Sequence, residues 1–268
     1  MDGLPQTLAL DLERDGGWLT VWFNQPEIRN PLTAERVREL LALCSALTDR
    51  SDIRGVTFRG RGGIFCAGGD LKSFKSVFQG GGGRTEVVAL SLEAADVFDA
   101  IDALPQVTVM AVEGAAMAGG FGLVCVGDVV VADAEATFAL TETRIGLTPA
   151  QIAPFVLRRL GLRHGRRLML LAAMLDASEA AAVGLVDSVV AGPEAMTAEI
   201  AAIRAKVRRC APGAVAETKR LIRSLPGQSR GAQKQTAAEC FADSMLSAEG
   251  REGITSFLEK RKPRWAED

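Results

Sequence analysis

The sequence predicts an α/β fold, and three observations support this prediction. Short apolar segments rich in β-branched residues alternate with longer segments of helical spacing up to about residue 192. Only helix-like segments follow that point. With 48% hydrophobic residues, a chain of 268 residues can bury a sizeable core. This order is typical of an α/β core followed by a helical appendage, so we expect a core over 1–192 and a C-terminal helical region over 193–268.

The expected strands are short and apolar. The first, at 18–23, combines tryptophan, threonine and valine, and a turn with Pro26 follows it. The others are expected at 56–58, 107–112, 129–132, 136–139 and 184–190.

The expected helices have apolar positions at helical spacing. Thr33 is a plausible N-cap for a helix ending at Leu47, and Pro105 follows a helix over 86–104. Further helices are expected at 123–126, 150–160, 165–175, 193–209, 212–224, 231–247 and 248–261. The polar segment 73–83 ends in four glycines, so we expect it to be a mobile loop.

The charge balance argues against a nucleic-acid protein. Lys and Arg number 31 and Asp and Glu 33, a net charge of −2, whereas nucleic-acid-binding proteins usually have a basic excess. The chain has no apolar run of membrane-spanning length, and its N-terminus does not resemble a signal peptide. Its five cysteines lack CxxC spacing and are read as reduced thiols. We therefore expect a cytoplasmic protein without membrane or nucleic-acid partners.

The residue types that are missing limit which catalytic and metal-binding chemistry is possible. His164 is the one histidine, there is no tyrosine, and the basic surroundings of His164 look like a solvated helix start. A histidine-based metal cluster is excluded, and we expect no metal site. Acid–base chemistry must then come from carboxylates, lysine or cysteine.

Two glycine-rich turns, 66–71 and 118–122, each follow a predicted strand and lead into a helix-like segment. A helix start has N–H groups without intrahelical partners and the positive end of the helix dipole. Glycine lets a ligand approach that backbone closely. Two such turns directed at one point could form a main-chain oxyanion hole, although tight packing alone would also explain the glycines.

Several motifs in this order resemble the crotonase, or enoyl-CoA hydratase/isomerase, family. They are the segments 26–32, 138–147, 182–186, 249–254 and 257–261 together with the two glycine turns. The resemblance covers nearly the whole chain. It implies a spiral of ββα units with a C-terminal helical region that forms a homotrimer or a dimer of trimers. It also implies an acyl-CoA thioester as substrate, with coenzyme A as part of that substrate and no other cofactor.

The resemblance also implies roles for single residues. The N–H groups of Gly69 and Gly119 would hold the thioester oxygen as an enolate develops. Of the two carboxylates that the family's hydratases use, one matches Glu142, but the other falls at Gly122, where this chain has no acid. Glu142 would then act as the acid and base. It could instead be a surface carboxylate at a helix start, paired with Arg144 or with a free N–H.

For the nucleotide end of the substrate, the resemblance implies a mostly backbone and basic binding site. Phe257 and Lys260 would lie near the adenosine and phosphates, across a subunit interface. Arg29 would meet the nucleotide, and the carbonyl of Ala67 would contact the adenine. A solvated helix end would also explain Lys260.

Segments 112–114, 119–123, 149–156 and 208–212 are similar to those of isohexenylglutaconyl-CoA hydratases and the related 3-methylglutaconyl-CoA hydratases. These enzymes add water to a β-branched enoyl-CoA with a distal carboxylate. We expect the same reaction here and hypothesise that Gly122 leaves room for the branched chain. Two alternatives stay open: a Δ3,Δ2-enoyl-CoA isomerase using Glu142 alone, and a non-catalytic CoA-ester binding protein.

Overall fold

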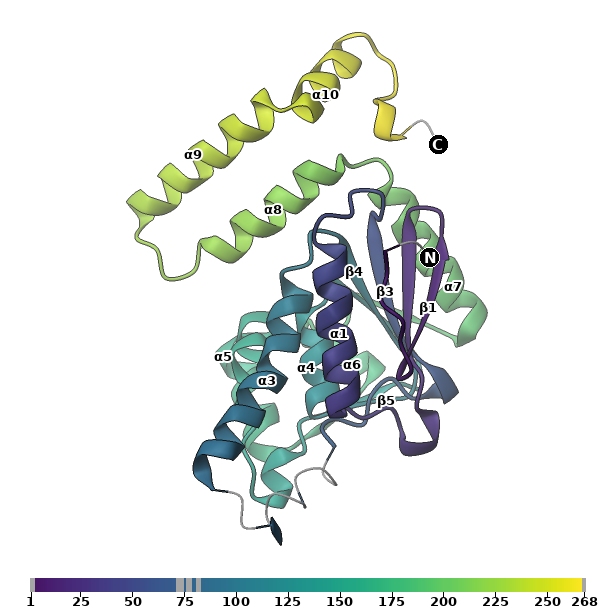
Figure 1. Cartoon of the computed structure of the whole chain (residues 1–268), viewed down its shortest axis with the longest axis vertical. Coiled ribbons are helices and arrows are strands. Elements are labelled where there is room, and N and C mark those ends of the chain that lie inside the picture. Colours follow the sequence, from purple (N-terminus) through teal and green to yellow (C-terminus); the bar gives the residue numbers. More distant parts are fainter. Residues whose placement is uncertain (1–2, 71–74, 76–78, 81–82, 267–268) are drawn as a thin grey trace.

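A computed structural model describes residues 3–70, 75, 79–80 and 83–266, and it has the predicted α/β core (Figure 1). The main sheet has six strands in the order β1-β2-β3-β4-β6-β9. Their bounds are β1 Leu10–Asp15, β2 Trp18–Phe23, β3 Gly55–Gly60, β4 Val107–Val112, β6 Val129–Asp133 and β9 Ser188–Val190. Strand β1 is antiparallel to β2, and the remaining neighbours are parallel.

A smaller sheet lies beside the main one. It consists of β5 (Ala115–Met117), β7 (Thr137–Ala139) and β8 (Met174–Asp176), with β7 in the middle. An isolated parallel bridge pairs Cys66 with Ala116, so the first glycine turn joins this sheet. The small sheet thereby brings both glycine turns to one edge of the core.

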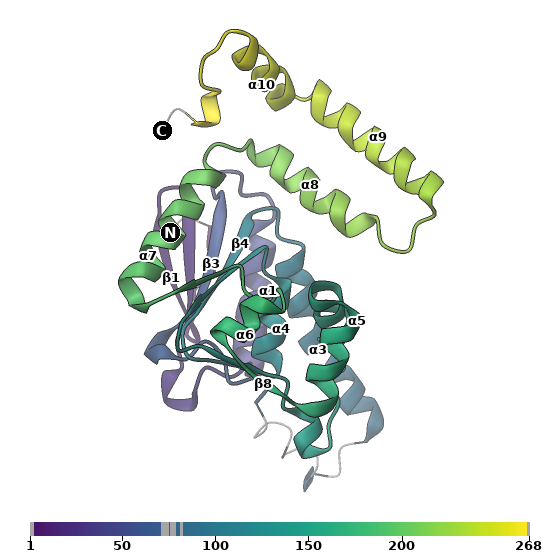
Figure 2. The ribbon, with the colours of Figure 1, turned by 180° about the vertical axis from the view of Figure 1, so that it is seen from behind.

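The helices before residue 192 cover one face of the main sheet (Figures 1 and 2). Their bounds are α1 Ala34–Leu47, α3 Arg84–Asp102, α4 Gly119–Val126, α5 Ala153–Leu171 and α6 Ala177–Ala182. Short 3-10 turns lie at η1 Pro26–Ile28, η2 Arg61–Gly63 and η3 Glu142–Ile145. The predicted N-cap of α1 is confirmed, because the Thr33 hydroxyl accepts the N–H of Arg36 at 3.2 Å.

The C-terminal region is helical, as predicted. It comprises α7 Gly192–Val207, α8 Pro212–Ser224, α9 Arg230–Leu246, α10 Ala248–Leu258 and the short turn η4 Arg264–Ala266. Helix α7 packs on the other face of the main sheet, where Met196 and Ile200 join a buried cluster with Trp18 and Val109. Helices α8, α9 and α10 extend beyond the end of the sheet (Figure 2). The division of the chain at 192 and 193 stays a prediction.

One predicted helix end needs correction, and one strand was not predicted. The helices expected at 150–160 and 165–175 fall on α5, which Gly161 divides into two helical parts because its backbone angles (φ 68°, ψ 171°) are not helical. The helix ends at Leu171 because Ala172 is left-handed (φ 45°), and Met174–Asp176 is a strand. Strand β1, which the sequence did not predict, pairs antiparallel with β2. Most of the loop expected at 73–83 lies outside the described residues.

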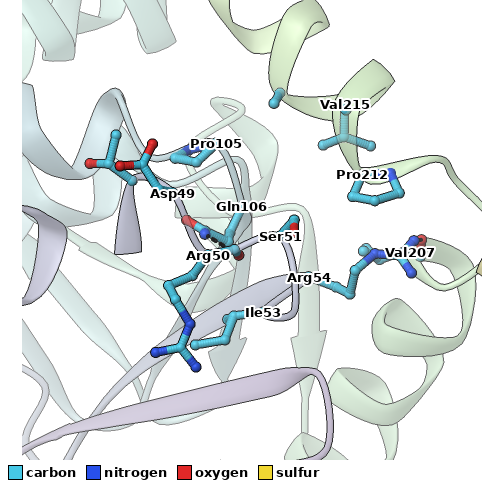
Figure 3. A pocket seen from close by; sticks show the side chains of 13 residues that line it. Asp49, Arg50, Ser51, Ile53, Arg54, Pro105, Gln106, Val207, Pro212 and Val215 are labelled. Carbon is cyan, nitrogen blue, oxygen red and sulfur yellow. Dashed lines mark hydrogen bonds between the residues drawn. The ribbon is translucent and has the colours of Figure 1, made fainter. Parts of the chain in front are cut away.

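A cavity of about 210 Å³ separates part of the core from the start of α8 (Figure 3). It is lined by side chains from 48–51, 53–54 and 105–106 and by Val207, Pro212 and Val215. Arg54 bridges this boundary, because its guanidinium donates to the carbonyls of Val207 and Cys210. None of the helices in the described part of the chain combines the length and the apolar character that a bilayer span requires.

Candidate active site

The first glycine turn is held by the loop between β2 and α1. Asn30 is fully buried, and its side-chain amide donates to the carbonyls of Arg61 and Ile64 at 2.9 and 2.7 Å. Close by, the N–H of Leu32 donates to the carbonyl of Gly68 at 2.7 Å, and Leu32 forms a bridge with Gly69. These bonds fix the backbone that presents the N–H of Gly69.

The two turns are tied together through Cys66. Its N–H donates to the carbonyl of Ala115 at 3.0 Å, and its carbonyl accepts the N–H of Met117 at 2.9 Å. A Cβ on Gly120 would lie 2.4 Å from the Cys66 carbonyl oxygen, so a side chain at 120 would force the turns apart. The glycine at 120 therefore serves the close packing of the turns.

The donors of the proposed oxyanion hole lie close together. The position that a Cβ on Gly119 would take is 3.7 Å from the backbone nitrogen of Gly69. Within the described residues, neither of these N–H groups donates to a protein acceptor. Gly119 is the first residue of α4, so the positive end of the helix dipole adds to the field there. Two unpaired donors at one place can hold one anionic oxygen.

The residue before Gly119 has a strained backbone. Ala118 has φ 49° and ψ −116°, a conformation that L-residues rarely adopt. Its N–H is held by the carbonyl of Ala139 in β7 at 2.8 Å. The sharp turn at Ala118 lets the chain pass from β5 directly into α4, which begins at Gly119.

Glu142 has the electrostatics of an acid–base group. It begins η3, three residues after the end of β7, and one of its side-chain oxygens, Oε2, is buried without a hydrogen-bond partner in the described structure. Burial raises the pKa of this carboxyl group above its usual range. A buried, unpaired carboxylate oxygen is costly to keep and is a mark of functional sites.

The backbone that carries Glu142 is anchored to the end of α5. The Arg144 guanidinium donates to the carbonyl of Ala172 at 2.6 Å, and the Thr143 hydroxyl donates to that of Met169 at 3.2 Å. Arg144 therefore pairs with a backbone carbonyl, and no ion pair joins it to Glu142 among the described residues. The alternative of a surface ion pair between these two residues is wrong.

The space hypothesised beside Gly122 is already filled. A Cβ at this position would lie 2.3 Å from Cγ2 of Ile152 and 3.0 Å from Cε1 of Phe98. Both of these side chains belong to the main core, where Ile152 is 4% exposed. The hypothesis that Gly122 makes room for a branched acyl group is wrong, because Ile152 packs directly on the glycine. An apolar wall therefore adjoins Gly122, the position at which this chain lacks the second carboxylate.

The four residues expected to bind CoA fall into two groups. The N–H of Ala67 donates to the carbonyl of Arg29 at 3.0 Å, so these two residues lie together beside the first glycine turn. Phe257 on α10 and Lys260 just after it are exposed at the opposite end of the molecule (Figure 1). One chain therefore does not bring the two groups together.

The buried cysteines have a structural role. Burial raises the pKa of the Cys66 thiol to about 11 and that of Cys125 to about 12, so both are inert core residues as expected. Within the described ranges, no cluster of three or more His, Cys, Asp or Glu side chains could hold a metal ion. The cavity of Figure 3 contains neither Glu142 nor the glycine turns.

Comparison with known proteins identifies the family of this chain. A family model described as enoyl-CoA hydratase/isomerase matches residues 13–268. A solved structure of Pseudomonas aeruginosa AtuE is similar, with 41% identity, a TM-score of 0.93, and 97% of this chain and 100% of that one covered. An enoyl-CoA hydratase/isomerase structure from Marinobacter aquaeolei has 38% identity and a TM-score of 0.92, covering 97% and 99% of the two chains.

A Thermus thermophilus protein, provisionally named an enoyl-CoA hydratase, is 36% identical over 245 residues, which cover 91% of this chain and 96% of that protein. The matches span the core and the C-terminal helices alike, so the expected crotonase fold is confirmed. The chain belongs to the enoyl-CoA hydratase/isomerase family and is an enzyme of that family acting on acyl-CoA esters.

Proposed function

We propose that this enzyme hydrates a β-branched enoyl-CoA of the glutaconyl type, with Glu142 as the one carboxylate that moves protons. The observation that carries the proposal is the buried, unpaired Oε2 of Glu142 on a backbone segment anchored by Arg144. The N–H groups of Gly69 and Gly119 hold the thioester oxygen. Losing one such donor typically costs about 3–4 kcal/mol of transition-state stabilisation.

A single carboxylate can serve both halves of the addition. Glu142 takes a proton from a water molecule as the water oxygen bonds to C3 and the electron pair of the double bond moves into the thioester as an enolate. The protonated Glu142 then returns that proton to C2. A raised pKa suits this exchange, because both protonation states become accessible nearer to neutral pH.

Glu142→Gln tests the proposal. With 3-methylglutaconyl-CoA, the wild type should remove the absorbance of the conjugated thioester, and the variant should be slower by about 10²–10⁴-fold. The variant should still bind the ester, because the oxyanion donors are main-chain groups. Equal rates for the two proteins would contradict the role of Glu142.

A second candidate is a Δ3,Δ2-enoyl-CoA isomerase. The apolar wall of Ile152 and Phe98 beside Gly122 favours it, because a single base with no second acid suffices to move a proton between C2 and C4. A gain of conjugation from 3-hexenoyl-CoA, without consumption of 3-methylglutaconyl-CoA, would identify this activity. Binding of both esters without turnover would identify a non-catalytic CoA-ester binding protein.

We propose that the enzyme assembles as a homotrimer or a dimer of trimers, which brings Phe257 and Lys260 to a neighbour's Arg29 and Ala67 around the CoA. Large apolar side chains exposed on the C-terminal helices support this assembly. They are Ile222, Phe241, Leu246, Ile254, Phe257 and Leu258. Light scattering of the wild type and of Phe241→Asp would test it, with a smaller particle expected for the variant.

A further inference from the structure

A polar contact joins α3 to the segment that precedes α5. The side-chain amide Nε2 of Gln151 donates to the hydroxyl oxygen of Ser91 at 2.8 Å, and both side chains are half-buried. The hydroxyl proton of Ser91 and the second N–H of Gln151 meet no acceptor in the described part of the chain. The pair therefore offers two unused hydrogen-bond donors side by side.

This pair lies next to the wall of the active site. Gln151 precedes Ile152, whose side chain packs on Gly122, and Ser91 precedes by seven residues Phe98, which packs on the same glycine. Residues seven apart share one face of a helix, so Ser91 lies on the face of α3 from which Phe98 contacts Gly122 in α4. The pair thus adjoins the apolar wall on both segments, α3 and the residues before α5.

The position of the pair along α3 matches the position of the oxyanion donors on α4. Helix α3 leads back to the start of β4 and α4 to the start of β6, and these two strands are parallel neighbours, so the two helices have the same direction. Phe98 lies level with Gly122. Ser91 is about 10 Å closer to the start of α3 than Phe98 is, and Gly119 is about 4–5 Å closer to the start of α4 than Gly122 is. Ser91 therefore lies about 6 Å beyond the level of Gly119, where an acyl chain held at that residue could reach.

The surroundings of the pair suit an acyl chain with an anionic end. Val87 and Val88 lie one turn before Ser91 on the same face, and they are 38% and 40% exposed. Arg84, one further turn along this face, is exposed and adds positive charge. The acidic Glu86 and Glu93 stand five residues before and two residues after Ser91, so they project from other faces of α3.

We propose that Ser91 and Gln151 form a subsite for the carboxylate at the far end of the acyl chain. The inference rests on the proposed function in that the acyl chain is of the glutaconyl type. The Ser91 hydroxyl and the free N–H of Gln151 each donate to one carboxylate oxygen, and Val87 and Val88 contact the chain itself. Such donors fix the position of the carboxylate while solvent at the mouth of the site still reaches it.

Binding of unreactive esters tests the subsite independently of catalysis. Isothermal titration would compare 3-methylglutaryl-CoA with isovaleryl-CoA, which has the same branch but no carboxylate. The wild type should bind the first about tenfold or more tightly, since hydrogen bonds to a charged group are the strong ones. Ser91→Ala should reduce this preference severalfold and Gln151→Glu should reduce it further, and both should leave the affinity for isovaleryl-CoA within twofold.

Gln151→Glu is the sharper variant, because the Ser91 hydroxyl can still bond to a carboxylate at 151 and keep the two segments together. Repulsion between that carboxylate and the ligand should then remove the preference altogether. Glu93→Gln, close by on another face of α3, is the matched control and should bind both esters as the wild type does.

Lack of preference in the wild type, or a preference that survives in both variants, would overturn the subsite. Equal losses for the two esters would also overturn it, because they would indicate a merely structural contact. If the binding preference behaves as expected but 3-methylglutaconyl-CoA is not hydrated, the proposed hydratase reaction fails and the subsite stands.

Discussion

The contact between Gly122 and Ile152 predicts a strong energetic coupling between these positions. In Gly122→Ala the new Cβ would lie 2.3 Å from Cγ2 of Ile152, closer than carbon atoms can approach. Overpacking of this kind costs about 1–3 kcal/mol. Replacing a glycine inside a helix by alanine stabilises the helix by up to about 1 kcal/mol, which offsets part of this cost. We therefore expect Gly122→Ala to lower the free energy of unfolding by about 0–2 kcal/mol.

Truncation of Ile152 should weaken that effect. Ile152→Ala alone should cost about 2–5 kcal/mol, because the side chain is buried in the main core. In that background the Cγ2 atom is gone, whereas the Cβ of residue 152 still lies 2.9 Å and Cε1 of Phe98 3.0 Å from the new Cβ, so Gly122→Ala should cost less than it does in the wild type. The coupling energy between the two substitutions should then equal the part of the overpacking that Cγ2 causes, about 1–3 kcal/mol.

Urea unfolding of the wild type, both single variants and the double variant at one protein concentration measures this coupling. Gly231→Ala in α9 is a matched control, because a Cβ there has no neighbour closer than 3.9 Å. Its effect should simply add to that of Ile152→Ala. Additivity within about 0.5 kcal/mol for Gly122→Ala and Ile152→Ala would refute the packing argument. That result would also indicate that the space beside residue 122 is available to the substrate.

Three further predictions concern the residues around Glu142 and Gly119. Glu142→Gln should have a higher Tm than the wild type at neutral pH, because burial penalises the ionised carboxylate. Because the pKa of Glu142 is raised in the folded protein, the difference in Tm between the variant and the wild type should be absent below the usual carboxyl pKa and should grow as the pH rises through the folded pKa. A Tm difference that stays constant across that pH range would contradict this. Arg144→Ala removes the 2.6 Å bond to Ala172 and should lower kcat about tenfold or more with little change in KM, whereas a change in KM alone would show that Arg144 does not position Glu142. Ala118→Gly relieves the backbone at φ 49° and should raise the Tm while lowering kcat, since Gly119 is then held less rigidly; unchanged kcat would indicate that the strain has no part in the reaction.

Local sequence signals were sufficient for most of the secondary structure. The β-branched run at 107–112 and the Thr33 cap of α1 were placed correctly, because strand propensity and capping depend on adjacent residues. Strand β1, with the acidic and basic sequence LDLERD, has a weak apolar signal of its own and forms by pairing with β2. Gly161 interrupts α5 with non-helical backbone angles, so the break predicted between two helices lies where the glycine stands.

The sequence by itself determined the fold class, the family resemblance and the identity of the candidate groups, because the glycine turns and Glu142 stand in motifs that are local in the chain. Only the tertiary structure decided what surrounds them. It brings Ile152 and Phe98, 30 and 24 residues from Gly122 in sequence, into contact with this glycine, the position at which the chain lacks a second carboxylate. It also leaves Oε2 of Glu142 buried without a partner while Arg144 bonds elsewhere. Close packing and desolvation depend on contacts between distant segments, so no local pattern can specify them.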